Sequence, residues 1–256
     1  MSRSHATFVH NDMGAKVLLF GASGKTGRYV AKFALDAGHD VIAFVRDPDK
    51  LRSVLVEVGV DPALVDARVT ILRGELTDLD SVRSAVRDGG LSRDAGDVIV
   101  FCAGKPKSFA LVAGAPMLLP AVRAIAETMR EVGLKRILIQ TGAMSLDGRL
   151  RRDPSYRAKR FMTFYMSPLL CIKDMVVDNW ALTPYVHTEM MDLEWIVTRP
   201  GPLAETRSKN TEKKALGPAS SDAFTAYVDV GEWTAKAVFD ADLVHTAPIL
   251  AYVGRK

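Results

Sequence analysis

The sequence predicts an α/β fold in which helices cover both faces of one parallel, doubly wound β-sheet. Short and nearly continuous apolar runs such as DVIVFCA alternate with segments of helical periodicity. Repeated strand–helix–strand units with right-handed crossovers produce a parallel sheet. The chain has 256 residues, of which 48% are hydrophobic, so it is long enough to bury a large core.

Each element is expected from a local pattern. Strands are expected at the apolar runs Lys16–Phe20, Asp40–Val45, Arg68–Leu72, Asp97–Cys102, Arg136–Gln140 and Glu194–Val197. Helices are expected between them at Thr26–Ala37, Asp49–Val58, Leu79–Arg87 and Pro116–Val132. Asp78 is placed to cap the third of these helices, and Gly133 to end the fourth. A last helix (Val230–Asp240) and a last strand (Ile249–Val253) close the predicted fold.

The regular alternation breaks after Thr141. Residues 145–192 predict a long and mostly helical insertion, and residues 202–228 a polar insertion punctuated by Pro and Gly. Residues 1–14 are expected to form an N-terminal arm, and residues 15–256 a single domain with a small substrate-side region towards its C-terminus. Both insertions follow the carboxyl ends of strands, where open α/β sheets bind their ligands.

The composition predicts a cytoplasmic protein, and the expected partner is a small molecule. The polar start MSRSHATFVHND lacks a signal-peptide pattern, and no apolar run approaches the length of a membrane span. Cys102 and Cys171 have neither metal-ligand spacing nor the density of a disulfide scaffold, so no metal site is expected. The net charge of +4 includes one local basic run, Gly148–Arg160, which is typical of a solvated face or of a loop beside an anionic ligand. Neither a nucleic acid nor a membrane is expected as a partner.

The loop GASGKTG, which follows the first strand and opens the first helix, could cradle either of two phosphate ligands. A P-loop needs the spacing GxxxxGK[ST], but five residues before Gly24 stands Leu19, inside the strand. A dinucleotide fingerprint fits better. Gly21 permits the tight turn, Gly24 the approach of a pyrophosphate, and Gly27 the close packing of helix on strand. The helix N-terminus then directs free N–H groups and its positive dipole end at the phosphates.

The end of the second strand selects between the two nicotinamide cofactors. NAD-specific sites place an acid there for the ribose 2′-hydroxyl, whereas NADP-specific sites place Arg or Lys for the 2′-phosphate. Arg46 stands at the tip and Lys50 follows one helical turn later, while Asp47 lies one position beyond the tip. NADP(H) is therefore the expected cofactor, with NAD(H) as the alternative.

Six motifs occur in a characteristic order along the chain: GASGKTG, VRDPDKL, GELTD, FCAG, KRILIQTGAM and LEWIVTRPGPL. This order resembles that of the atypical short-chain dehydrogenase/reductases, and more narrowly the NAD(P)H-binding, NmrA-like group that includes biliverdin reductase B, a flavin reductase. The resemblance runs from about Lys16 to Phe239 and implies a Rossmann-like fold.

The resemblance also implies where the cofactor binds. It assigns the pyrophosphate to Gly21, Ala22, Ser23, Gly24, Lys25 and Thr26, and the 2′-phosphate to Arg46 and Lys50. It assigns the adenine to Glu75 and Leu76, the ribose to Cys102, Ala103 and Gly104, and the nicotinamide to Thr141, Gly142, Arg199, Pro200 and Gly201. Members of the family usually have Asp where Glu75 stands.

The catalytic pattern of the typical short-chain dehydrogenases is missing. Those enzymes use a Ser after strand five and a Tyr-x-x-x-Lys helix, whose Lys lowers the pKa of the tyrosine that passes a proton to the substrate. Here Gly142 occupies the serine position, which leaves Thr141 or Ser145 as a hydroxyl group. Lys159 follows Tyr156 by three residues rather than four. The correctly spaced pair, Tyr252 and Lys256, lies at the end of the sequence and is interpreted as accidental.

Three functions remain open at this point. The chain is an NADPH-dependent reductase that passes hydride to a flavin, a quinone or an activated carbonyl or aromatic compound, an NADP-binding sensor that regulates partners, or an isomerase or lyase that uses bound NADP. The segment FMTFYMSPLLCIKDMVVDNW is rich in Met and aromatic residues and favours an enzyme with an apolar, planar substrate, although core packing explains it equally well. Tyr185 and His187, before the sixth strand, are candidates to face the substrate pocket or the surface.

Overall fold

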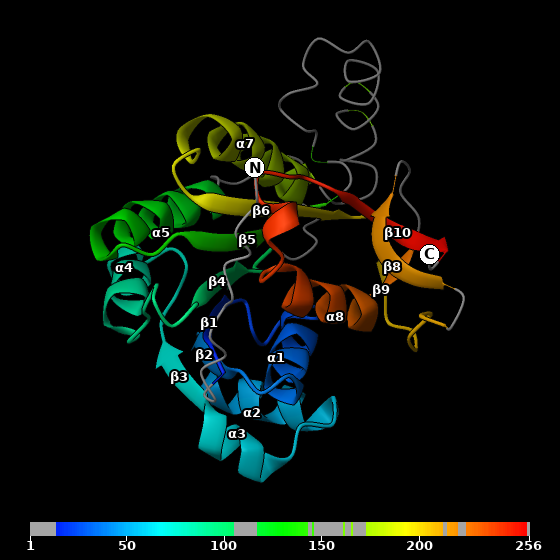
Figure 1. Cartoon of the computed structure of the whole chain (residues 1–256), viewed down its shortest axis with the longest axis horizontal. Coiled ribbons are helices and arrows are strands. Elements are labelled where there is room, and N and C mark those ends of the chain that lie inside the picture. Colours follow the sequence, from blue (N-terminus) through cyan, green and yellow to red (C-terminus); the bar gives the residue numbers. More distant parts are fainter. Residues whose placement is uncertain are drawn as a thin grey trace, which may run out of the picture.

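The computed structural model describes residues 14–104, 117–142, 145, 161, 165, 173–211, 214–219 and 224–254. Its centre is an eight-stranded sheet with the strand order β3-β2-β1-β4-β5-β6-β10-β8 (Figure 1). The strands are β1 (Lys16–Phe20), β2 (Asp40–Val45), β3 (Val69–Arg73), β4 (Val98–Phe101), β5 (Arg136–Gln140), β6 (Glu194–Pro200), β8 (Lys214–Ala219) and β10 (Ile249–Gly254). All neighbouring strands pair in parallel except β8, which is antiparallel to β10. The order β3-β2-β1-β4-β5-β6 is that of a Rossmann fold, which confirms the predicted fold class.

Helices lie on both faces of this sheet, as Figure 1 shows. One face is covered by α1 (Gly27–Asp36), α2 (Pro48–Glu57), α3 (Pro62–Arg68) and α8 (Tyr227–Ala237), and the other by α4 (Leu79–Asp88), α5 (Leu118–Val132) and α7 (Lys173–Glu189). A short 3-10 helix, η2 (Ala241–Leu243), precedes β10, and a small parallel pair is formed by β7 (Leu203–Ala204) and β9 (Thr225–Ala226). Within the described part of the chain, none of these helices combines the length and the apolar character needed to cross a bilayer.

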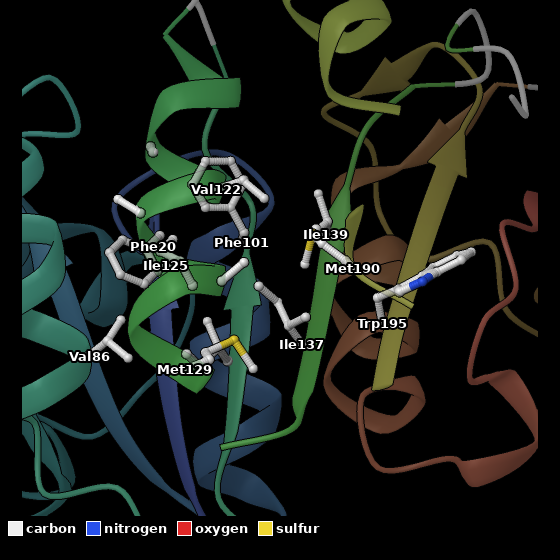
Figure 2. Packing of buried hydrophobic residues seen from close by; sticks show 14 of the residues in the cluster. Phe20, Val86, Phe101, Val122, Ile125, Met129, Ile137, Ile139, Met190 and Trp195 are labelled. Atoms are coloured by element: carbon white, nitrogen blue, oxygen red, sulfur yellow. The ribbon is translucent and has the colours of Figure 1, made fainter. Parts of the chain in front are cut away.

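Successive residues of each strand enter two different cores. In β1, Leu18 and Phe20 pack under α4 and α5, whereas Val17 and Leu19 pack under α1. Figure 2 shows the first of these cores, where the side chains of β4 and β5 meet those of α5 and Trp195 of β6 lies at the far side. Burial on both faces explains why the strands read as continuous apolar runs rather than as alternating ones.

Capping residues set several of the helix ends that the sequence predicted. The carboxylate of Asp78 accepts hydrogen bonds from the first-turn amides of α4, and Gly133 ends α5 with φ 78°. Asp47 and Asp61 cap α2 and α3 in the same way. Helix α3 was not predicted, although Asp61 followed by a proline is an ordinary helix start.

The structure corrects several predicted bounds. β3 begins at Val69 because α3 continues through Arg68, and β6 runs to Pro200 because its last two residues pair with β10. α8 begins at Tyr227, directly after β9, and ends at Ala237. The segment 202–228, predicted as a polar insertion, contributes β7 and β9, which pair with each other, and β8, which pairs with β10.

Candidate cofactor site

The carboxyl edge of the sheet brings the predicted site segments together. Strand order reverses between β1 and β4, so the loops that follow these two strands diverge to opposite faces and leave a crevice between them. The glycine-rich loop follows β1, and residues 102–104 follow β4. The two segments touch, because the amide of Cys102 donates to the carbonyl oxygen of Phe20 at 2.9 Å.

Close backbone contacts require two of the three glycines in the loop. Gly21 has φ 86°, and a Cβ added there would lie 2.8 Å from the amide nitrogen of Ala103. A Cβ on Gly27 would lie 2.1 Å from the carbonyl oxygen of Gly21. Gly24 is exposed, and a Cβ there would meet only that same oxygen, at 3.0 Å. The loop is therefore tight at its base and open at Gly24, which is the shape that a pyrophosphate requires.

The N-terminus of α1 is the helix end that faces this opening. Asp side chains cap α2, α3 and α4, but Thr26, the N-cap of α1, makes no side-chain capping bond, and the first turn of α1 holds no acid. The amides of a first helical turn lack partners within the helix, and the helix dipole places positive charge beside them. An anionic group fits this helix end, since among the described residues no carboxylate caps it.

The remaining loop residues differ in their accessibility. Ala22 is buried and Ser23 is half-buried. Lys25 is exposed, and its Nζ forms an ion pair of 3.0 Å with the carboxylate of Glu205, in the segment after β7. Its ammonium group also lies 5.6 Å from the centre of the Tyr227 ring, at the start of α8. Lys25 therefore connects the glycine-rich loop to the segment that follows β7.

Gln140, the last residue of β5, lies at this site although it is not among the residues predicted to bind the cofactor. Its Nε2 donates to Oγ1 of Thr26 at 3.2 Å, and its Oε1 accepts from Sγ of Cys102 at 3.7 Å. Burial raises the pKa of the Cys102 thiol to about 12, so this thiol stays protonated and remains a donor. The amide links β4, β5 and the N-cap of α1 beneath the loop. A polar residue that ends an otherwise apolar strand is the sequence signal that could have revealed it.

The segment after β2 presents cations on its surface. Arg46 and Lys50 are both exposed, at the tip of β2 and in the first turn of α2. Asp47, which lies between them, is engaged in capping, because its Oδ1 accepts from the amide of Lys50 at 3.0 Å. The nearest acid is thus committed to the helix start, while the two cations remain accessible.

The segment after β3 lies beside that cationic segment. Glu75 is exposed, and its carboxylate is 3.5 Å from the hydroxyl of Thr77, which donates to it. Leu76 is partly buried against the core that contains Phe44. On the other side of the crevice, after β4, Ala103 is buried and Gly104 is exposed.

Two hydroxyl groups form a buried pair after β5. Oγ1 of Thr141 and Oγ of Ser145 are 2.6 Å apart, and both residues are almost fully buried. Thr141 also lies within donating distance of the carbonyl of Thr198 at 3.2 Å, and Ser145 of the carbonyl of Gly142 at 2.6 Å. The two hydroxyl protons thus have three acceptors within the protein: the carbonyl oxygen of Thr198, that of Gly142, and whichever of the two hydroxyl oxygens accepts from the other. These groups suit the orientation of a ligand better than the donation of a proton.

Arg199 braces this region from β6. The residue is buried, its Nε donates to the carbonyl of Ala247 at 2.7 Å, and its Nη1 donates to the carbonyl of Ser145 at 3.3 Å. Pro200 and Gly201, which follow, are buried as well. Arg199 therefore joins the segment after β5 to the segment that enters β10.

Comparison with known proteins identifies the family. The family model described as NAD(P)H-binding matches residues 21–241, which include every residue predicted to bind the cofactor. The chain belongs to this NAD(P)H-binding family. Family membership indicates a nicotinamide cofactor, and the tight glycine-rich loop with the open N-terminus of α1 fits the pyrophosphate of such a cofactor.

Individual relatives agree with this family. The chain is 34% identical over 84 residues to reductase pytE of Aspergillus terreus, a match that covers 33% of this chain and 32% of that protein. The oxidoreductase ylbE from Lactococcus lactis has a similar structure, with a TM-score of 0.64, 14% identity and coverage of 93% and 91% of the two chains. ChuY, an anaerobillin reductase from Escherichia coli O157:H7, has a TM-score of 0.63, 20% identity and coverage of 92% and 96%. The chain spans about a third of the length of the curated reductase. At 14% and 20% identity, the two structural matches show a shared fold.

Two residues that were candidates for the substrate pocket lie elsewhere in this NAD(P)H-binding fold. The Tyr185 ring packs under the guanidinium of Arg123, 5.1 Å away on α5, and His187 meets the ring of Trp195 edge-on at 4.7 Å. Both lie in the last turns of α7, which lead into the amino end of β6, at the opposite edge of the sheet from the glycine-rich loop.

Of the two tyrosine–lysine pairs noted in the sequence, only Tyr252 lies within the described residues. Tyr156, Lys159 and the basic run 148–160 lie outside the described residues. Oη of Tyr252 donates to the carboxylate of Asp229 at 2.7 Å and accepts from the amide of Ala226 at 3.0 Å. Tyr252 is thus engaged in joining β10 to α8.

Proposed function

We propose that this protein is an NADPH-dependent oxidoreductase that passes hydride to a flavin, a quinone or an activated carbonyl or aromatic compound. The observation that carries the proposal is the position of the Thr141–Ser145 hydroxyl pair. Thr141 directly follows Gln140, whose side chain is bonded to the N-cap of α1. The hydroxyl group of Thr141, fixed by Ser145, therefore follows by one residue the Gln140 side chain that supports the glycine-rich loop.

The cofactor supplies the hydride when it is bound. The chain supplies binding and orientation: the glycine-rich loop and the N-terminus of α1 bind the pyrophosphate, and the oxygen atoms of Thr141 and Ser145 hold the ring end of the cofactor or the substrate. Both hydroxyl protons have acceptors within the protein. We therefore favour acceptors whose reduction needs little acid catalysis from a side chain, such as flavins and quinones.

NADP rather than NAD is proposed from the end of β2. Arg46 and Lys50 are accessible, whereas Asp47 is committed to capping α2. A guanidinium and an ammonium group suit a 2′-phosphate, and a carboxylate already used by a helix is a poor partner for a 2′-hydroxyl.

The names of the relatives support a reductase over the other two functions. The curated relative is named a reductase, and ChuY is described as an anaerobillin reductase. An apolar, planar substrate remains part of this proposal, as does a cytoplasmic location.

The deciding experiment mixes the purified protein with NADPH and, one at a time, flavins, quinones and aromatic ketones, while the nicotinamide absorbance is followed. Turnover of at least one acceptor is expected, and the Thr141→Val variant should lose turnover while it still binds NADPH. Saturable NADPH binding without turnover on the whole panel would support the cofactor sensor instead. Conversion of a compound with no net loss of NADPH would support the isomerase or lyase.

A further inference from the structure

A third cation stands at the edge of the sheet where Arg46 and Lys50 lie. Arg73 is the last residue of β3, and its register partner on β2 is Val45, the residue directly before Arg46. Arg73 is exposed, as are the other two cations. The pairing of β2 with β3 therefore places Arg73 beside the tip of β2, although 27 positions separate Arg46 from Arg73 in the sequence.

The backbone at this point is held firmly. The amide of Gly74 donates to the carbonyl of Val45 at 3.0 Å, which joins the exit of β3 to the end of β2. A Cβ on Gly74 would lie 2.4 Å from the ring of Phe44, so the chain passes against this ring without room for a side chain. Arg73 is consequently carried on a fixed backbone next to Arg46.

Strand alternation determines the face on which Arg73 lies. Val69 and Ile71 of β3 pack into the core under α1 and α2, and Val45 is buried in the same core. Arg73 follows Ile71 by two residues, so it lies on this face too. Lys50 is in the first turn of α2, the helix that covers this face, and its amide is fixed by the carboxylate of Asp47.

The three cations at this edge form no ion pair with a described residue, including the nearby Asp47, Asp49 and Glu75. At the other end of the same two strands, by contrast, Arg68 pairs with Asp40 at 2.7 Å. Neighbouring like charges on paired strands cost free energy, and a bound dianion offsets that cost.

We infer that Arg73 is a specificity-determining residue that binds the 2′-phosphate of NADPH together with Arg46 and Lys50. This inference rests on the proposed NADP preference and adds to it a residue from a different strand. Two guanidinium groups on adjacent strand ends can each present paired N–H donors to one phosphomonoester, which a single point charge cannot do.

The test compares Arg73→Ala with Arg46→Ala and with a matched control, Arg93→Ala. Arg93 is also exposed and without an ion pair in the described structure, but it lies before β4, at the opposite edge of the sheet. Dissociation constants for NADPH and NADH are measured by fluorescence titration at low and high salt. Arg73→Ala should weaken NADPH binding about five- to tenfold, change NADH binding less than about twofold, and reduce the salt dependence for NADPH. Arg93→Ala should change none of these.

Thermal unfolding of the ligand-free variants separates binding from a structural role. Arg73→Ala should leave the melting temperature unchanged or raise it, since it removes repulsion, and Arg73→Gln serves as a second variant if the alanine protein does not fold. Equal losses for both cofactors, or an NADPH affinity within twofold of wild type, would overturn the inference. If Arg46→Ala alone removes the NADPH preference, the inference about Arg73 fails and the NADP preference stands. If neither variant affects the preference, both fail.

Discussion

The side-chain amide of Gln140 donates to the hydroxyl oxygen of Thr26 at 3.2 Å, and so joins the end of β5 to the N-cap of α1. Thr26 has helical backbone angles, φ −86° and ψ −45°, and makes no side-chain capping bond, so α1 differs from the three Asp-capped helices of the same fold. The amides of Arg28 and Tyr29 in its first turn donate to the carbonyl oxygens of Gly24 and Thr26, at 3.1 and 3.0 Å. Gln140 therefore supports the N-cap of α1 at a helix end whose first turn holds no acid.

Replacing Gln140 with Leu is expected to weaken the binding of NADPH and NADH to the same extent. The loss should be about 0.5–1.5 kcal/mol, the scale of one hydrogen bond. Thr26→Val should give a similar loss. In the double variant the two losses should not add, since the residues act through one bond, and isothermal titration measures the coupling. Full additivity would contradict a shared role.

Gly27 and Gly24 should respond differently to substitution. Gly27→Ala places a methyl group 2.1 Å from the Gly21 carbonyl oxygen, so it should lower the free energy of unfolding by about 1–3 kcal/mol and weaken cofactor binding. Gly24→Val should leave a folded protein that does not bind the dinucleotide, because the side chain fills the approach of the pyrophosphate. Urea unfolding and cofactor titration distinguish the two cases. Robust ATP hydrolysis that is lost in Lys25→Ala would instead restore the P-loop interpretation.

Arg46→Ala should discriminate between the two cofactors. The expected loss is about 1.5–3 kcal/mol for NADPH, the scale of a charge-assisted hydrogen bond, and little for NADH. Dissociation constants for both cofactors measure this difference. Equal losses would mean that Arg46 does not contact the 2′ position.

Hydride transfer should depend on Thr141 more than on any one tyrosine. Tyr156→Phe, Tyr165→Phe and Tyr185→Phe should each lower kcat by less than about tenfold, well below the 10²–10⁴ expected when a general acid is removed. Thr141→Val should cost more, through lost orientation of the ring or of the substrate oxygen. Single-turnover transfer from NADPH measures these rates. A collapse in one tyrosine variant with cofactor affinity intact would identify that tyrosine as the proton donor.

Cys102 should make the stability of the fold depend on alkaline pH. Burial raises the pKa of its thiol from 9.0 to about 12, so between these values the folded protein keeps a proton that the unfolded chain releases. The contribution is fully present below pH 9 and is lost as the pH rises towards 12. Urea unfolding of wild type and Cys102→Ala over this range should show a steeper decline for wild type. Parallel curves would mean that the thiol is not desolvated.

Much of the fold could be predicted because its signals act over a few residues. The bounds of β1, β2 and β5 were predicted as observed, since each apolar run begins at a charged residue and ends at a glycine, a charged or a polar residue. The capping role of Asp78 and the helix end at Gly133 follow from the same local chemistry. β8 was not predicted, because its sequence, KALGPA, has a strand conformation only through its pairing with β10.

The alternating strands and helices, the glycine-rich loop after β1 and the family to which these motifs point could all be predicted from the amino-acid sequence. Which distant residues meet depends on the tertiary structure. Gln140 reaches Thr26 across 114 positions, and Arg73 stands beside the end of β2 because β3 pairs with β2 in one register. Tyr185 and His187 proved to lie towards the opposite edge of the sheet from the glycine-rich loop. The physical reason is that periodicity and capping depend on neighbours in the chain, whereas such contacts depend on strand order and register, and a shift of one residue moves a side chain to the other face.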